Sequence, residues 1–225
     1  MKPRPIIVTV TGNVLNQGLY SLTAVDRANK GIELANEPGR LQTQVDLAMV
    51  MEQMSTRNIV LKHKDGSTDK VDITKYLATK KERWNPYLRE GDVIIVPRKN
   101  PKKNVFGIYG EVNSPGRYEL VEGDSFLDAI DIGMGLTKLA MRQNIEFTRL
   151  AVDGNTLSSR IFNLDDIESG KETNFPLESG DRIIVKARKE LREDYRVNVQ
   201  GEVLYPGTYP ITKDRTKLSE IIMQA

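Results

Sequence analysis

The chain has 225 residues, of which 28% are charged and 39% hydrophobic, and its formal net charge at pH 7 is +2. This length is sufficient for two domains that each bury a modest hydrophobic core. The small net charge argues against a nucleic-acid-binding protein, because such proteins concentrate lysine and arginine to neutralise phosphates. The absence of cysteine excludes thiol catalysis, cysteine-ligated zinc and disulfide bonds.

The first predicted elements are a β-hairpin and a helix. Residues 6–10 are apolar and mostly β-branched, which is typical of a strand. Asn-Gln-Gly at 16–18 predicts a turn, after which Tyr20 and Leu22 belong to a returning strand. An apolar pattern of helical spacing then runs from about 24 to 35.

Residues 37–55 are predicted to be an insertion, because the equivalent interval in the second copy described below is shorter. Apolar residues between 45 and 51 indicate a second short helix within it. Met49, Met51 and Met54 could form an adaptable apolar surface. We interpret them instead as side chains that fill an irregular gap in the core.

A second hairpin and a closing strand complete this first unit. Strand patterns at 58–62 and 71–73 flank Asp65-Gly66, a pair that favours a type I′ turn. The β-branched strand at 93–96 follows Gly-Asp and is predicted to lie at the centre of the sheet. The basic link at 97–104 could form a patch that binds nucleic acid or anionic lipid. Because no aromatic residue interleaves in it, we interpret it as a solvated connector.

The same order of elements returns in a second unit. A strand at 105–109 leads into Gly-Glu-Val-Asn-Ser-Pro-Gly-Arg-Tyr-Glu-Leu at 110–120, whose Pro115 and Gly116 suit a type II turn. Asp124 or Ser125 is then expected to cap a helix. The remaining segments of the first unit correspond to residues 144–148, Asp153-Gly154, residues 162–164 and residues 182–185.

A third copy of the motif begins at 201–211, with Gly-Glu-Val, Pro-Gly and Tyr in the same order. It ends within its helix at 217–225, so we expect a truncated unit and a piece of a longer protein. No apolar run approaches the roughly 20 residues of a membrane span, and residues 1–10 lack the core of a signal peptide. The predicted domains are 5–97, with the insertion at about 37–55, then 104–187 and the partial copy 195–225.

The repeated order of hairpin, helix, hairpin and closing strand predicts an α+β fold. Each unit is expected to form a mixed sheet packed on one helix, which is the ubiquitin-like β-grasp. The pattern Gly-Glu-Val, Pro-Gly and Tyr, followed by a helix and then by Leu-x-x-Gly-Asp and Ile-x-Val, resembles the soluble-ligand-binding β-grasp domain called SLBB. Tandem copies of that domain are typical of bacterial polysaccharide export proteins of the outer membrane.

The resemblance implies a non-catalytic periplasmic part of a capsule or exopolysaccharide export protein. Its units would serve as oligomerisation modules that contact the polysaccharide, in a homo-oligomer that works with an inner-membrane export partner. The export domain, lipidated cysteine and membrane helix of such exporters are not seen here, so outer-membrane association is implied only for a longer parent protein. The alternative is a soluble-ligand or protein-binding β-grasp module of another system, such as a respiratory-complex subunit.

The residues suggest no catalytic centre, cofactor or metal site. His63 is the only histidine, and between Lys62 and Lys64 on a strand it is expected to be exposed. Two groups of acidic residues are interpreted as helix caps and solvated faces, namely Asp124, Asp128 and Asp131, and Asp165, Asp166 and Glu168. We therefore expect that the protein is not an enzyme.

Ligand contacts are predicted at polar residues of the second hairpin, namely Asn113, Ser114 and Arg117. Trp84 is a further candidate, as a contact point or as an anchor for its loop. The repeated tyrosines are expected in or near the cores, because each begins a returning strand beside an apolar residue. They are Tyr20, Tyr118 and Tyr209.

Overall fold

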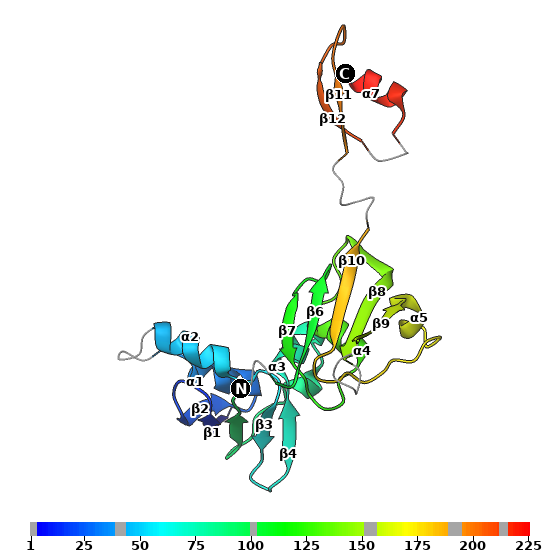
Figure 1. Cartoon of the computed structure of the whole chain (residues 1–225). Helices are drawn as coiled ribbons and strands as arrows, with labels where there is room; N and C mark the ends of the chain where they lie inside the picture. Colours follow the sequence, from blue (N-terminus) through cyan, green and yellow to red (C-terminus); the bar gives the residue numbers. More distant parts are fainter. Residues whose placement is uncertain (1–3, 39–43, 100–102, 151–156, 189–194, 212–215) are drawn as a thin grey trace.

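The computed structural model describes residues 4–38, 44–99, 103–150, 157–188, 195–211 and 216–225 (Figure 1). The first unit contains a five-stranded sheet in the order β2-β1-β5-β3-β4. Strand β1 runs parallel to β5, and the other neighbours are antiparallel. The strands are β1 (Pro5–Gly12), β2 (Gly18–Thr23), β3 (Ile59–Lys62), β4 (Thr68–Val71) and β5 (Val93–Val96).

Helix α1 (Ala28–Ala35) packs on this sheet because the alternating residues of β1 point toward it. Val8 and Val10 are buried in the same cluster as Ile32. Gly31 allows close packing, since a Cβ at this position would lie only 2.7 Å from Ile94 Cδ1. The other helices of the unit are α2 (Gln44–Gln53), α3 (Ile73–Thr79) and the 3₁₀ turn η1 (Glu82–Trp84).

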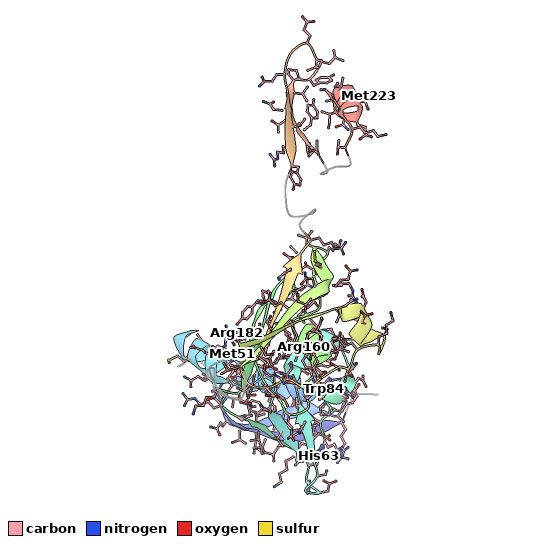
Figure 2. The ribbon with its side chains drawn as sticks, turned by 45° about the vertical axis from the view of Figure 1, so that its right-hand side comes forward. Met51, His63, Trp84, Arg160, Arg182 and Met223 are labelled. Atoms are coloured by element: carbon pink, nitrogen blue, oxygen red, sulfur yellow. The ribbon has the colours of Figure 1, made fainter. Side chains whose placement is uncertain are left out.

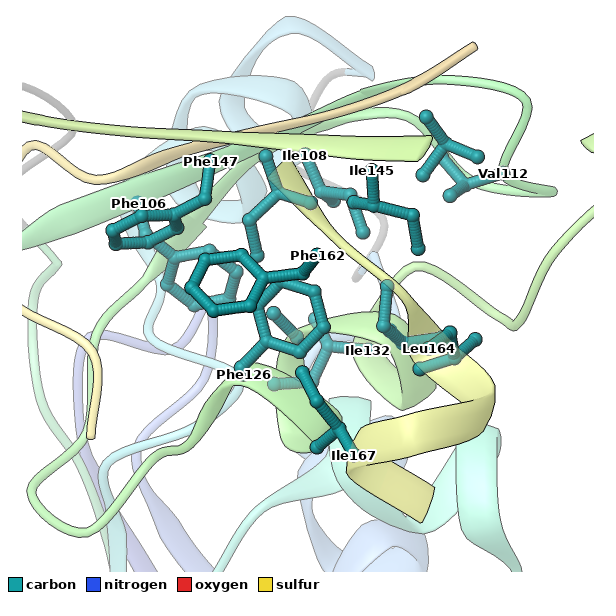
Figure 3. Packing of buried hydrophobic residues seen from close by; sticks show 14 of the residues in the cluster. Phe106, Ile108, Val112, Phe126, Ile132, Ile145, Phe147, Phe162, Leu164 and Ile167 are labelled. Atoms are coloured by element: carbon teal, nitrogen blue, oxygen red, sulfur yellow. The ribbon is translucent and has the colours of Figure 1, made fainter. Parts of the chain in front are cut away.

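The second unit repeats the topology in the order β7-β6-β10-β8-β9, again with one parallel pair, β6 with β10. Its core contains four contacting phenylalanines. Phe126, Phe147 and Phe162 are buried (Figure 3), and Phe175 is partly buried. The predicted central position of the closing strand is confirmed in both sheets. The elements are β6 (Val105–Gly110), β7 (Gly116–Glu119), α4 (Phe126–Ile132), β8 (Ala140–Leu150), β9 (Leu157–Phe162), α5 (Leu164–Glu168) and β10 (Arg182–Ala187).

Two glycines occur in the repeated motif at 110–120. The backbone conformation requires glycine at the first position, Gly110, and not at Gly116 of the Pro-Gly pair. Gly110 has a φ of +83°, and a Cβ there would lie 2.0 Å from the carbonyl oxygen of Val185 at the end of the central strand. Gly12 is equivalent, with φ +98° and 2.1 Å to the Val96 oxygen. Gly116 does not have a positive φ, so the expected type II turn was wrong.

The repeated tyrosine closes the loop of each hairpin. Tyr20 Oη donates to the Asn16 carbonyl at 2.6 Å, and Tyr118 Oη donates to the Ser114 carbonyl at 2.7 Å. Tyr209 makes the same bond to Tyr205 in the third copy. The rings of Tyr20 and Tyr118 pack against the two cores, as expected.

Two further local expectations change. Asp65 does not have a positive φ while Gly66 does, so this pair does not form a type I′ turn; Asp153-Gly154 lies outside the described residues. Helix α1 begins four residues later than predicted, because Asp26 accepts bonds from the Thr23 amide and hydroxyl and forms a turn before it.

The third copy contains a hairpin and a helix. These are β11 (Arg196–Val199), β12 (Gly207–Pro210) and α7 (Leu218–Gln224). Figure 1 shows that they lie apart from both five-stranded sheets. Within the described residues β11 pairs only with β12.

Candidate functional site

The two complete units meet at a buried arginine. Arg57, just before β3, is 2% exposed and donates from Nε and Nη2 to Asp72 Oδ2 at 3.0 and 2.8 Å. Its other side-chain bonds cross to the second unit, from Nη1 to Asp124 Oδ2 at 2.9 Å and to the Glu119 carbonyl, and from Nη2 to Asp124 Oδ1 at 3.0 Å. One guanidinium therefore joins carboxylates of both units.

A buried lysine from α3 completes this contact. Lys75 Nζ lies 3.0 Å from Asp124 Oδ1 and 2.9 Å from Asp128 Oδ1. Its ammonium also lies 4.7 Å from the centre of the Trp84 ring, a cation–π contact. We call Arg57, Asp72, Lys75, Asp124 and Asp128 the junction cluster.

The electrostatics of the junction cluster favour the charged forms of Arg57 and Asp128, whereas burial raises the pKa of Asp72 above its ordinary value despite the bonds from Arg57. Burial opposes ionisation of Arg57, but hydrogen bonds and charge from Asp124 and Asp72 outweigh it and raise the pKa of the guanidinium. Burial also acts against the Asp128 carboxylate, yet its bonds from Lys75 and Ser125 leave its pKa below the ordinary value. Asp72 and Ser125 additionally cap α3 and α4, so the cluster is tied to the starts of two helices.

The interpretation of the first acidic group as helix caps and solvated faces holds for Asp128, which is part of a capping box, and for the exposed Asp131, but it is wrong for Asp124. Asp124 is 2% exposed and binds two cations, while Ser125 caps the helix and forms a capping box with Asp128. Asp165 and Glu168 do lie at the surface, where both contact Arg142. Sequence reasoning missed Arg57, which lies just before the second hairpin of the first unit, and Lys75, which follows that hairpin in α3.

The junction cluster is specific to this pair of units. At the positions of Arg57, Asp72 and Lys75, the second unit has Gln143, Asn163 and Asp166. A second pair of bonds reinforces the same junction, since Glu119 accepts from Ser55 Oγ at 2.6 Å and from Asn58 Nδ2 at 2.7 Å.

Beside the junction lies a cavity of about 490 Å³. An adjoining cavity of about 440 Å³ on the outer face of the second sheet shares Val105 and Arg117 with it. Arg117 is exposed and forms no ion pair with any described carboxylate. The first cavity is lined by Glu52, Thr56, Arg57, Thr74, Lys99, Val105, Arg117, Tyr118 and Glu119.

The predicted ligand residues are not brought together. Asn113 Nδ2 donates to the Met134 carbonyl at 2.9 Å, and Ser114 Oγ lies 2.9 Å from Tyr118 Oη, so both stabilise the hairpin loop. Neither lines either of the two cavities. Trp84 contacts Lys75 and Arg83 at the junction through its ring. Of the predicted ligand residues, Arg117 alone lines both cavities.

The expectation that His63 is exposed was wrong. It is 6% exposed, with Nδ1 2.8 Å from Asp92 Oδ1 and Nε2 3.1 Å from Asp69 Oδ2. The hydrogen bond with Asp92 raises the pKa of His63, and burial only partly opposes this. At the same place in the second unit, Arg149 binds Asp181 through Nε and Nη2 at 2.8 and 2.6 Å.

The aspartates Asp92 and Asp181 of the two Leu-x-x-Gly-Asp motifs thus each bind a basic side chain, His63 in the first unit and Arg149 in the second. Among the residues that the structure describes, no group of three or more His, Asp or Glu side chains could hold a metal ion. None of the described helices has the length and hydropathy to cross a bilayer.

The fold therefore defines a protein of tandem β-grasp units, α+β in class, as predicted. Residues 105–158, which run from β6 into β9, match the family model of the SLBB domain. The predicted resemblance to the SLBB domain is thus confirmed over these residues. No curated protein matches the chain.

Proposed function

We propose that the chain is a non-catalytic part of a polysaccharide export system, in which the two complete units form one rigid block. The observation that carries this proposal is the buried two-point contact of Arg57 with Asp124 across the junction. Domains joined by small polar interfaces usually move relative to one another. A junction closed by buried, fully bonded charges resists opening, because separation would leave those charges without partners.

A rigid block suits the role of a scaffold. A protein that assembles around a moving polymer needs fixed angles between its modules. The same contacts can then form between every pair of neighbouring copies in the oligomer. The SLBB match supports a ligand-binding module. The open cavities beside the junction, bordered by Arg117 and Lys99, would allow weak contact with a passing glycan.

The export role implies further features of the system. The protein would act in the periplasm as a homo-oligomer, beside an inner-membrane export partner. A longer parent protein would provide the association with the outer membrane. The role requires no cofactor, no nucleic acid and no turnover of the glycan.

The proposal is tested by deleting the gene in its source organism and measuring surface and intracellular polysaccharide. We expect surface polysaccharide to fall while polymer accumulates inside, and the wild-type gene to restore export. Arg57→Ala should restore it poorly, whereas Arg142→Ala, which removes an exposed arginine, should restore it fully. Unchanged surface polysaccharide after deletion, or cleavage of the isolated glycan by the purified protein, would refute the proposal.

A further inference from the structure

Two arginines that form no ion pair with the described residues flank a glycine on the outer face of the second sheet. Gly107 of β6 is the register partner of Arg117 on β7 and of Arg182 on β10. The neighbouring residues Phe106 and Ile183 are buried in the core, so the two arginines point to the opposite, exposed face. Arg117, Gly107 and Arg182 therefore form one row across three strands.

A tyrosine ring lies over the glycine of this row. A Cβ built on Gly107 would lie 2.5 Å from Tyr109 Cε2 and 2.8 Å from its Oη, so only glycine leaves room for the ring here. Tyr109 remains 36% exposed. We call Tyr109, Arg117 and Arg182 the platform; all three line the cavity of about 440 Å³.

The charge of the platform is not neutralised by the described part of the chain. Neither Arg117 nor Arg182 forms an ion pair there. Asp181, which also lines the cavity, is bound by Arg149 at 2.6 Å. Glu119, on the same strand as Arg117, is held by Ser55 and Asn58. Two guanidiniums are thus free to bind an anion.

The fold itself does not require the platform. In the first unit the same row of register partners is Leu19, Thr9 and Val93, and Thr11 stands where the second unit has Tyr109. That sheet forms without either arginine or the aromatic ring. The platform is therefore a feature of the second unit alone among the two complete sheets.

We propose that the platform binds an acidic sugar residue, such as a uronic acid within a polysaccharide. The planar guanidinium group can donate two parallel hydrogen bonds to a carboxylate. Two guanidiniums, one on either side of the Tyr109 ring, would fix the position of the acidic sugar. The exposed aromatic ring offers an apolar surface for the C–H face of a pyranose. This inference rests on the proposed export function and narrows the glycan to an anionic one.

The experiment is calorimetric titration of the full chain with oligogalacturonate and with its methyl ester, which has the same backbone without the charge. We expect the acid form to bind, and the ester to bind more weakly by a factor of about ten or more. Arg117→Ala with Arg182→Ala, and separately Tyr109→Ala, should each weaken binding of the acid form about tenfold. Tyr109→Phe should retain most of the affinity, because the ring and not the hydroxyl makes the contact.

The matched control is Arg160→Ala, which removes another surface arginine of the same unit. Arg160 Nη2 lies 3.9 Å from Glu172 Oε1. Figure 2 shows Arg160 and Arg182 at different places on the second unit. This variant should bind as the wild type does. Circular dichroism and the melting temperature of every variant should match those of the wild type.

Absence of binding by the wild type, equal binding of acid and ester, or unchanged binding by the double arginine variant would each overturn the inference. Polyaspartate that binds as tightly as the oligosaccharide, without dependence on Tyr109, would also overturn it, since a sugar ring would then not be recognised. The export proposal is judged separately by gene deletion. Loss of surface polysaccharide without oligogalacturonate binding would leave that proposal standing and remove this one.

Discussion

The Arg57 guanidinium of the first unit and the Asp124 carboxylate of the second form a two-point ion pair at 2.9 and 3.0 Å, with both side chains only 1% exposed. Such a pair contributes to orientation more than to net stability, because burying the charges costs nearly as much as their attraction returns. Removing one partner lowers stability much more, because it leaves the other charge buried without an opposite charge.

We therefore predict that Arg57→Ala lowers the free energy of unfolding by about 3 kcal/mol or more, since Asp72 and Asp124 both lose their bonds to it. The two units should then unfold in separate transitions in scanning calorimetry. Arg142→Ala is the control, because its side chain is 38% exposed and its contacts with Asp165 and Glu168 should be worth about 1 kcal/mol or less. A single transition shifted no more than in the control would show that the junction cluster does not couple the units.

A second prediction concerns the first glycine of the motif. Gly110→Ala should be strongly destabilising, because its Cβ would lie 2.0 Å from the Val185 carbonyl oxygen at a φ of +83°. Gly123→Ala has a matched φ of +91° with nothing within 4 Å, so it should cost only the local strain, about 1–2 kcal/mol. Urea denaturation of both variants measures the difference. Equal losses would mean that the chain shifts to avoid the contact.

The repeats explain how much of the fold could be predicted. Two copies of the same order of strand patterns identified the hairpins, the main helices and the central closing strand, because these depend on local spacing. Helices α3 and α5 were missed, since seven and five residues are too short to show a helical period. Their capping residues Asp72 and Asn163 were the available signal.

The site was less predictable for a physical reason. Arg57 and Asp124 are 67 residues apart, and each looks like an ordinary surface residue within its own segment. Only the packing of one unit on the other buries both. His63 was misjudged in the same way, because its partner Asp92 lies 29 residues further along the chain.

A third prediction separates the methionines of the insertion. Met54 is 4% exposed in the core of the first unit, whereas Met49 and Met51 are 52% and 48% exposed. The interpretation as core filling therefore holds for Met54 and is wrong for the other two. Met54→Ala should lower the free energy of unfolding by about 2–5 kcal/mol. Met51→Ala should change it by about 0.5 kcal/mol or less. Denaturant titrations test both, and similar losses would contradict the difference in burial.

The last prediction concerns the effect of pH on the first unit. The pKa of His63 lies above its ordinary value of 6.5, chiefly through its bond with Asp92, with Asp69 adding to the effect and the positive charge of Arg89 opposing it. The protonated imidazole therefore stabilises the folded state. This contribution is fully present below the ordinary pKa and is lost as the pH rises through the raised value.

Urea denaturation at a series of pH values should show this loss in the wild type. His63→Arg, which copies the pairing of Arg149 with Asp181, should remove that part of the pH dependence, because arginine stays charged throughout. His63→Asn should also flatten the profile but at lower stability, since its neutral amide cannot neutralise the Asp92 carboxylate. If the wild type and His63→Asn lose stability in parallel as the pH rises, the dependence comes from other groups.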